Sequence, residues 1–102
     1  MTDVSIVSPI YYGENTIFEL TARIIAVMEK LNLSYEIIYV DDYSPDNSWS
    51  KIKSLANGND KIKGLKLSKN FGQHKSIAAG LDIASGNRIV VMDCDLQDQP
   101  EE

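Results

Sequence analysis

The sequence has 102 residues, of which 43% are hydrophobic and 25% charged, a composition typical of one small soluble domain. Its net charge of -5 argues against a nucleic-acid-binding protein, no apolar run approaches the roughly 18 to 20 residues of a membrane span, and the N-terminus lacks a secretory signal. The single cysteine excludes an internal disulfide and favours a reducing compartment.

The first part of the chain predicts a strand followed by a helix. Residues 4–8 are a short strand candidate that Pro9 ends. Apolar residues then recur at helical spacing over 17–31. Thr16 and Glu19 have the spacing of a capping box, so we expect the helix to begin there.

A second strand and helix follow. Residues 36–40 predict a strand that ends in Asp41 and Asp42. The Ser-Pro-Asp sequence at 44–46 supplies a cap residue, a proline suited to a first helical turn and a favourable acid, so it predicts a helix start. The Asn-Gly pair at 57–58 predicts the end of that helix.

The last part of the chain predicts one more helix between two strands. Residues 62–67 are a strand candidate, and Asn-Phe-Gly at 70–72 turns the chain. Apolar spacing over 77–84 predicts a helix closed by Gly86. The continuous apolar run at 89–92 predicts a strand buried on both faces.

This alternation predicts an α/β fold, a three-layer doubly wound and mostly parallel sheet of half-Rossmann type with strand order 3-2-1-4. In such sheets ligands bind outside the carboxyl ends of the strands, where the strand order reverses. We expect this switch point to gather the 9–14 loop, the 41–42 corner and the acids Asp93 and Asp95 in one crevice.

Asp93 and Asp95 are the strongest metal-ligand candidates. Side chains two apart on an extended segment point the same way, so both acids would face one side, with Cys94 turned away. Paired carboxylates repel each other unless a cation lies between them. Mg²⁺ and Mn²⁺ bind one or two carboxylates together with substrate phosphates. A polar strand exit with a helix cap is the alternative, but the convergence of three such stretches favours a site.

The familiar phosphate-binding loops are absent, because neither G-x-G-x-x-G nor G-x-x-x-x-G-K-[ST] occurs. A dinucleotide dehydrogenase or a P-loop ATPase is therefore disfavoured. A metal on the carboxylates can hold a nucleoside diphosphate instead. Tyrosines near the first strand can stack on a base, and Asp42 can accept a hydrogen bond from a base or ribose.

Four segments together resemble a known family. They are residues 9–14 (Pro-Ile-Tyr-Tyr-Gly-Glu), 40–46 (Val-Asp-Asp-Tyr-Ser-Pro-Asp), 70–75 (Asn-Phe-Gly-Gln-His-Lys) with Ala-Gly at 79–80, and 92–98 (Met-Asp-Cys-Asp-Leu-Gln-Asp). In order and spacing they resemble the N-terminal half of family 2 glycosyltransferases with the GT-A fold. D-x-D-L-Q-D-x-P-E and N-F-G-Q-H favour the branch that loads sugars onto polyprenyl or dolichyl phosphate. We expect residues 1–102 to be a single nucleotide-sugar-binding domain of a longer glycosyltransferase.

The resemblance implies roles for residues at the base end of the site. Tyr11 would border the nucleobase, with Pro9 shaping the loop and Glu14 nearby. Asp42 would hydrogen-bond the base, with Asp41 supporting the corner. The chain departs from the family pattern at three positions in these loops: Tyr12 replaces the usual asparagine, Gly13 an acid found in many relatives, and Tyr43 a common glycine. Outside these loops, Gln99 replaces a proline.

The resemblance also implies roles at the phosphate end. Asp93 and Asp95 would form the catalytic D-x-D motif, holding Mg²⁺ or Mn²⁺ against the diphosphate. Gln97 would contribute to the metal or its water shell. Lys69, where many relatives have arginine, would contact a phosphate.

The function implied is inverting, metal-dependent transfer of a sugar from a nucleotide-diphosphate sugar of the UDP or GDP type to a polyprenyl-phosphate acceptor, in cell envelope biogenesis. A phosphate monoester is already anionic at neutral pH and needs no strong base to attack C1. We expect the full-length protein to be cytoplasmic, at the inner face of the membrane, with membrane association through parts absent from this chain. These residues alone are expected to be inactive.

Two alternatives stay open. One is a glycosyltransferase with a sugar-hydroxyl acceptor, as in polysaccharide synthesis, which would need a carboxylate base further along the chain. The other is a non-catalytic receiver-like or flavodoxin-like binding module. Its acids would gather after the first strand, whereas here they follow the second and fourth, which disfavours it.

Overall fold

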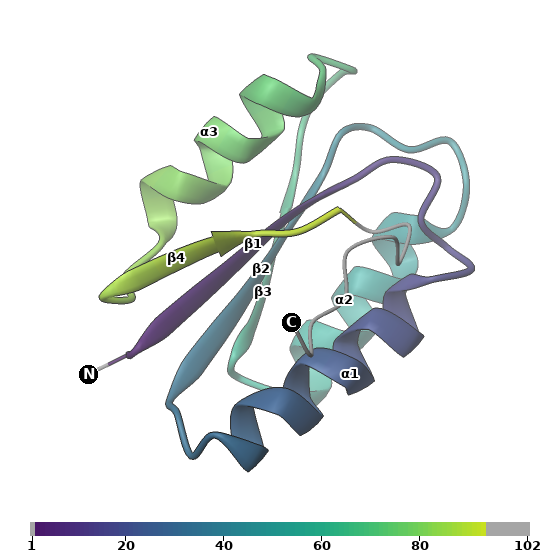
Figure 1. Ribbon diagram of the computed structural model, residues 1–102. Coiled ribbons are helices and arrows are strands. Elements are labelled where there is room, and N and C mark those ends of the chain that lie inside the picture. The colour runs from purple at the N-terminus through teal and green to yellow at the C-terminus, as the bar shows by residue number, and fades with distance from the viewer. Residues whose placement is uncertain (1, 94–102) are drawn as a thin grey trace.

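The computed structural model describes residues 2–93 and alternates four strands with three helices, as predicted (Figure 1). In chain order the elements are β1 Val4–Ile10, α1 Ile17–Lys30, β2 Tyr35–Asp41, α2 Ser48–Gly58, β3 Ile62–Lys66, α3 Gln73–Ile83 and β4 Arg88–Val91. Within these described residues, no helix combines the length and the apolar character that crossing a membrane requires.

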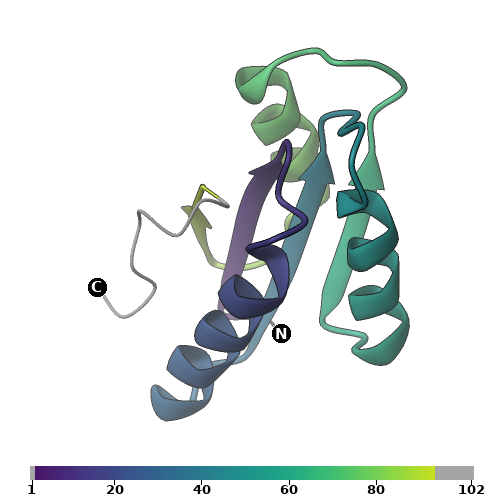
Figure 2. The ribbon, with the colours of Figure 1, turned by 90° about the vertical axis from the view of Figure 1, so that its right-hand side faces the viewer.

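The strands form one parallel sheet in the order β3-β2-β1-β4, which confirms the predicted topology. Helices α1 and α2 cover one face of the sheet, and α3 covers the other (Figures 1 and 2). The carboxyl ends of the parallel strands therefore share one edge. The strand order reverses between β1 and β4, so a ligand crevice is expected beside their ends.

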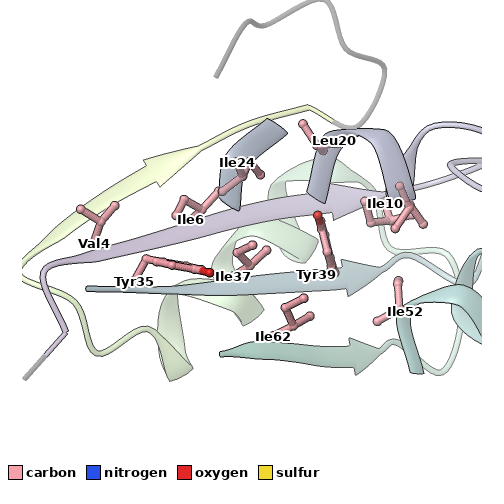
Figure 3. Close-up of a cluster of buried hydrophobic side chains, with 11 residues drawn as sticks. Val4, Ile6, Ile10, Leu20, Ile24, Tyr35, Ile37, Tyr39, Ile52 and Ile62 are labelled. Carbon is pink, nitrogen blue, oxygen red and sulfur yellow. The ribbon is translucent and has the colours of Figure 1, made fainter. Parts of the chain in front are cut away.

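The hydrophobic core has two parts because side chains of a strand alternate between faces. The larger cluster packs under α1 and α2 (Figure 3), and its buried residues are Val4, Ile6, Ile10, Ile17, Leu20, Ile24, Tyr35, Ile37, Tyr39, Ile52 and Ile62. A smaller cluster of Val7, Ile38 and Val40 lies on the opposite face. Most of these buried side chains belong to β1 and β2. Each fully buried aliphatic side chain contributes about 1.5–3 kcal/mol to stability, so these two strands form the stable centre from which the loops extend.

Helix α3 lies unusually close to the sheet at Gly80. A Cβ built on Gly80 would be 2.5 Å from Cγ1 of Val7 and 3.1 Å from Cγ2 of Val40. Any side chain here would therefore push the helix outward. This close packing explains a glycine inside a helix, where it otherwise costs up to about 1 kcal/mol relative to alanine.

The predicted start of the first helix is confirmed, since α1 begins at Ile17 with Thr16 as its N-cap residue, but the capping box does not form. The Thr16 hydroxyl donates instead to the carbonyl oxygen of Gly13 at 3.3 Å. The predicted start of the second helix is wrong. Helix α2 begins at Ser48 rather than within 44–46. The Asp46 carboxylate accepts the Ser48 N–H at 3.0 Å and the Ser48 hydroxyl at 2.6 Å, so the turn that precedes the helix is longer than expected.

Two predicted element ends also differ. Strand β1 continues through Pro9 to Ile10, whose carbonyl oxygen accepts the Asp42 N–H at 2.8 Å, because pairing with β2 persists beyond the proline. Helix α3 ends at Ile83 rather than at Gly86. Gly86 instead donates its N–H to the Ser5 hydroxyl at 2.7 Å.

Strand β4 is exposed, whereas its apolar run predicted burial on both faces. Ile89 is 47% exposed and Val91 43%. Among residues 2–93, β4 pairs with β1 alone and is an edge of the sheet, while α3 packs against β1 and β2. The prediction was wrong because an apolar run reports a preference for burial, and the neighbouring elements decide whether it is met.

Candidate functional site

A pocket of about 450 Å³ opens at the carboxyl edge of the sheet, at the switch point between β1 and β4. This volume lies in the usual range of ligand pockets, roughly 300–1,000 Å³. The residues that line it are Pro9, Ile10, Tyr11, Asp42, Asn70, Gly72, Gln73, Ser76 and Asp93. Four residues that the sequence placed in a site therefore meet here: Pro9, Tyr11, Asp42 and Asp93.

Asp42 holds the loop that leads into α3. Its Oδ1 accepts the backbone N–H of Phe71 at 2.8 Å, and its Oδ2 accepts that of Gly72 at 3.0 Å. The Asn70 side-chain amide donates to the backbone carbonyl of Asp42 at 3.3 Å. Because an ionised carboxylate offers about four lone-pair sites, these bonds are compatible with a further hydrogen bond from a ligand.

Asp41 is buried behind the pocket and is not among its lining residues. Its carboxylate accepts the Ser44 N–H at 3.3 Å to Oδ1 and 3.4 Å to Oδ2. Burial raises the pKa of the Asp41 carboxyl above its usual value, although the hydrogen bonds from Ser44 oppose the rise. Asp41 therefore holds the corner after β2 and does not face the site.

Tyr11 presents an aromatic ring at the mouth of the pocket. The side chain is 47% exposed, and its ring meets that of Tyr12 edge to face, with centroids 4.7 Å apart and planes at 78°. Partial desolvation, followed by the neighbouring Tyr12 and Asp42, raises the pKa of the Tyr11 phenol. The phenol therefore stays neutral at physiological pH, with an accessible ring that can stack on a base.

Two tyrosines in the loops after β1 and β2 have left-handed backbones. Tyr12 has φ 57° and Tyr43 has φ 59°. This region costs residues with a Cβ roughly 1–2 kcal/mol, and glycine and asparagine enter it most readily. The Ser44 hydroxyl accepts the Tyr12 N–H at 3.2 Å, and Nζ of Lys66 lies 5.8 Å from the Tyr43 ring centroid.

Glu14 and Lys69 are not among the residues that line the pocket. The Glu14 N–H donates to Asp46 Oδ2 at 3.3 Å, and the Lys51 ammonium donates to the Glu14 carbonyl oxygen. Glu14 is thus tied to the start of α2. Nζ of Lys69 lies 5.1 Å from the ring centroid of Phe71. Their roles in binding base and phosphate stay predictions.

Asp93 brings an exposed carboxylate to the pocket just after β4. Its Oδ1 accepts a hydrogen bond from the Gln73 side-chain amide at 2.9 Å. Asp95 and Gln97, the other predicted metal ligands, lie outside the described residues. Over residues 2–93, no group of three or more His, Cys, Asp or Glu side chains could hold a metal. The Asp93 carboxylate nonetheless fits Mg²⁺ or Mn²⁺, because these ions need only one or two protein carboxylates together with substrate phosphates.

The sequence predicted no site role for Gln73, nor for four other residues that line the pocket, Ile10, Asn70, Gly72 and Ser76. Gln73 begins α3 and lies among the lining residues. The signal that could have found Gln73 is the N-F-G-Q-H segment at 70–74, in which a polar side chain directly follows the predicted turn.

Comparison with known sequences gives a consistent family. The model of glycosyl transferase family 2 matches residues 5–102. An undecaprenyl-phosphate 4-deoxy-4-formamido-L-arabinose transferase from Yersinia pestis is 43% identical over 100 residues, covering 97% of this chain and 31% of that protein. An uncharacterized glycosyltransferase from Synechocystis is 40% identical over 99 residues, again with 97% and 31% covered. The chain thus spans about a third of the length of these curated relatives.

Solved structures confirm the GT-A fold class. S. aureus TarS 1-349 in complex with UDP-GlcNAc is 27% identical with a TM-score of 0.77, covering 92% of this chain and 27% of that one. The mannosyltransferase PcManGT from Pyrobaculum calidifontis, in complex with GDP-Man and Mn²⁺, is 21% identical with a TM-score of 0.75, covering 90% and 27%. At 21% identity, the similarity to PcManGT supports the fold and nothing further.

Proposed function

The chain belongs to glycosyl transferase family 2, and from this premise we propose that residues 1–102 are a single nucleotide-sugar-binding domain of an inverting glycosyltransferase. The donor is a nucleotide-diphosphate sugar of the UDP or GDP type, and the acceptor is a polyprenyl phosphate. The single observation that carries the proposal is the pocket that brings Tyr11, Asp42 and Asp93 together at the switch point of the sheet.

The pocket residues suit the two ends of such a donor. The exposed ring of Tyr11 stacks on the base, and the Asp42 carboxylate accepts a hydrogen bond from the base. Asp93, together with Asp95 and Gln97 beyond the described residues, is proposed to hold Mg²⁺ or Mn²⁺ against the diphosphate. Relatives support both substrate classes, since one is named for undecaprenyl phosphate and one structure contains UDP-GlcNAc.

The reaction follows from the charges of the reactants. A phosphate oxygen of the acceptor forms a bond to C1 of the sugar while the bond from C1 to the nucleoside diphosphate breaks, so the configuration inverts. A divalent ion, when bound, offsets the charge that builds on the departing oxygen, a contribution worth several kcal/mol. The acceptor phosphate is already anionic, with a second pKa near roughly 6, so no strong base is needed. Because this acceptor is a lipid, we expect transfer at a membrane surface, and we propose that it is the cytoplasmic face.

Calorimetry on the full-length protein tests the donor site. UDP and GDP are titrated with and without Mn²⁺ into the wild type, Asp93→Asn and Asp82→Asn, an exposed control on α3. We expect one nucleotide to bind more tightly with Mn²⁺, and this gain to be lost only in Asp93→Asn. Nucleotide binding that ignores Mn²⁺ in the wild type would overturn the metal-dependent site, and failure to bind either nucleotide would favour a non-catalytic module.

A transfer assay tests the acceptor. The full-length protein is incubated with the nucleotide sugar that it binds and either undecaprenyl phosphate or a sugar with free hydroxyls. Product on the lipid phosphate alone supports the proposal. Product on the hydroxyl alone would replace it with a polysaccharide-type transferase, even if the donor site is correct.

A further inference from the structure

We infer that Gln73 is a positioning residue for Asp93, and that Asp42 in turn fixes Gln73 by holding the start of α3. This inference rests on the proposed function, because it gives the Gln73–Asp93 contact a role in metal binding. Gln73 contacts the proposed metal ligand through a hydrogen bond between side chains 20 positions apart, and both residues line the pocket.

The contact itself suits this role. Asp93 follows β4 with an exposed side chain. The Gln73 amide donates to Oδ1 at 2.9 Å and so restricts that direction. An amide is neutral, so it orients the carboxylate and leaves the negative charge that attracts a cation. A lysine or arginine in its place would offset that charge.

The start of α3 is itself held firmly. Asp42 accepts the N–H groups of Phe71 and Gly72, and Gly72 adopts φ 98°, which a residue with a Cβ would enter only under strain. On the helix side, the Gly72 carbonyl accepts the Ser76 N–H at 3.1 Å and the buried Ser76 hydroxyl at 3.0 Å. Gln73 therefore extends from a fixed backbone.

Three consecutive residues, 71–73, thus join the two acidic ends of the pocket. Asp42, at the proposed base end, accepts the N–H groups of Phe71 and Gly72. Gln73 donates its side-chain amide to Asp93 at the proposed metal end. The arrangement ties the orientation of the metal carboxylate to the rigid carboxyl end of β2. Removing a hydrogen-bond partner of a metal ligand typically lowers metal affinity about 10- to 100-fold.

Gln73→Met in the full-length protein is the sharpest test, because methionine keeps the length of the side chain and removes its donor. Mn²⁺ binding is followed by electron paramagnetic resonance in the presence of saturating UDP or GDP, whichever the wild type binds. We expect Mn²⁺ affinity to fall about 10- to 100-fold. Affinity for the nucleotide without metal should not change, since Gln73 acts through Asp93.

Two further variants complete the experiment. Gln73→Asn keeps the amide but shortens its reach, so it should weaken Mn²⁺ binding in the same direction. His74→Leu alters an exposed neighbour in the same helical turn and should bind Mn²⁺ as the wild type does. Thermal unfolding of each variant checks that a change in Mn²⁺ affinity does not reflect loss of the fold.

The outcomes separate this inference from the proposed function. Wild-type Mn²⁺ affinity in Gln73→Met would overturn the positioning role and leave the proposed function standing. Equal losses of nucleotide affinity with and without metal would also overturn it, because they would show that Gln73 contacts the donor directly. A wild type without any metal-dependent nucleotide binding would overturn both.

Discussion

The carboxylate of Glu36 accepts two hydrogen bonds from Ser85, one from the backbone N–H at 2.6 Å and one from the hydroxyl at 3.0 Å. The same buried carboxylate accepts the Ser5 hydroxyl at 2.5 Å and the Lys63 ammonium at 2.8 Å. Glu36 lies near the start of β2, so this network joins β1, β2 and β3 to the α3–β4 connection at the edge opposite the pocket.

Glu36→Gln should destabilise the fold by about 1–3 kcal/mol. The NH₂ group of glutamine would face the donor groups of Ser5 and Ser85, and the ion pair with Lys63 would be lost. Lys63→Met should cost less, about 0–1 kcal/mol, since the Lys63 side chain is 47% exposed. Urea unfolding of both variants measures the difference. Equal losses would contradict a network centred on Glu36.

The same group predicts how stability depends on pH. Burial raises the pKa of Glu36, but the hydrogen bonds from Lys63, Ser5 and Ser85 outweigh it and lower the pKa from 4.5 to about 2. A depressed folded-state pKa stabilises the fold above the unfolded value, here by about 3 kcal/mol. This contribution is lost as the pH falls from 4.5 towards 2. Urea unfolding across that range should show the loss in the wild type and a flatter profile in Glu36→Gln.

Gly80→Ala should destabilise the protein although alanine favours helices. Its methyl group would lie 2.5 Å from Val7 Cγ1, and overpacking of this kind costs about 1–3 kcal/mol, against a helix-propensity gain of at most about 1 kcal/mol. Gly58→Ala is the control, because a Cβ on Gly58 meets nothing within 4 Å. Thermal unfolding should give Gly80→Ala a lower melting temperature than the wild type, and Gly58→Ala a melting temperature equal to or higher than that of the wild type.

Asp42→Asn should weaken both the fold and the nucleotide site. Asparagine offers one acceptor oxygen where Phe71 and Gly72 need two, so one N–H would face an amide donor, at a cost of about 1–3 kcal/mol. Asp60→Asn removes an exposed acid and should have little effect. Urea unfolding and nucleotide titration are the two readouts. A fully stable Asp42→Asn would show that the loop before α3 does not depend on this carboxylate.

Tyr43→Gly should be more stable than Tyr43→Ala, which reverses the usual order of the two residues. With φ at 59°, alanine would keep the strain of a left-handed Cβ, roughly 1–2 kcal/mol, whereas glycine would not. Both variants lose the ring beside Lys66, so that contact cancels in the comparison. Chemical denaturation of the pair measures the order directly. Greater stability of Tyr43→Ala would rule out strain at this corner.

The sequence predicted the fold well where the signal was local. Helical spacing over 17–31 gave α1, and apolar runs before Asp41 and Asp93 gave β2 and β4, because side-chain periodicity reports which face is buried. Burial of β4 was not predictable in this way. Its exposure depends on which elements pack beside it, and a strand's own residues carry no information about that.

The features of the site likewise separate into those that the sequence predicts and those that depend on tertiary packing. The sequence by itself determined the order of elements, the strand order and the placement of Tyr11, Asp42 and Asp93 at one edge, because motif spacing and parallel topology suffice for these. Only the tertiary structure decided that Asp42 grips the loop before α3 and that Gln73 reaches Asp93. These bonds join residues 29, 30 and 20 positions apart, and their geometry depends on how closely α3 packs on the sheet.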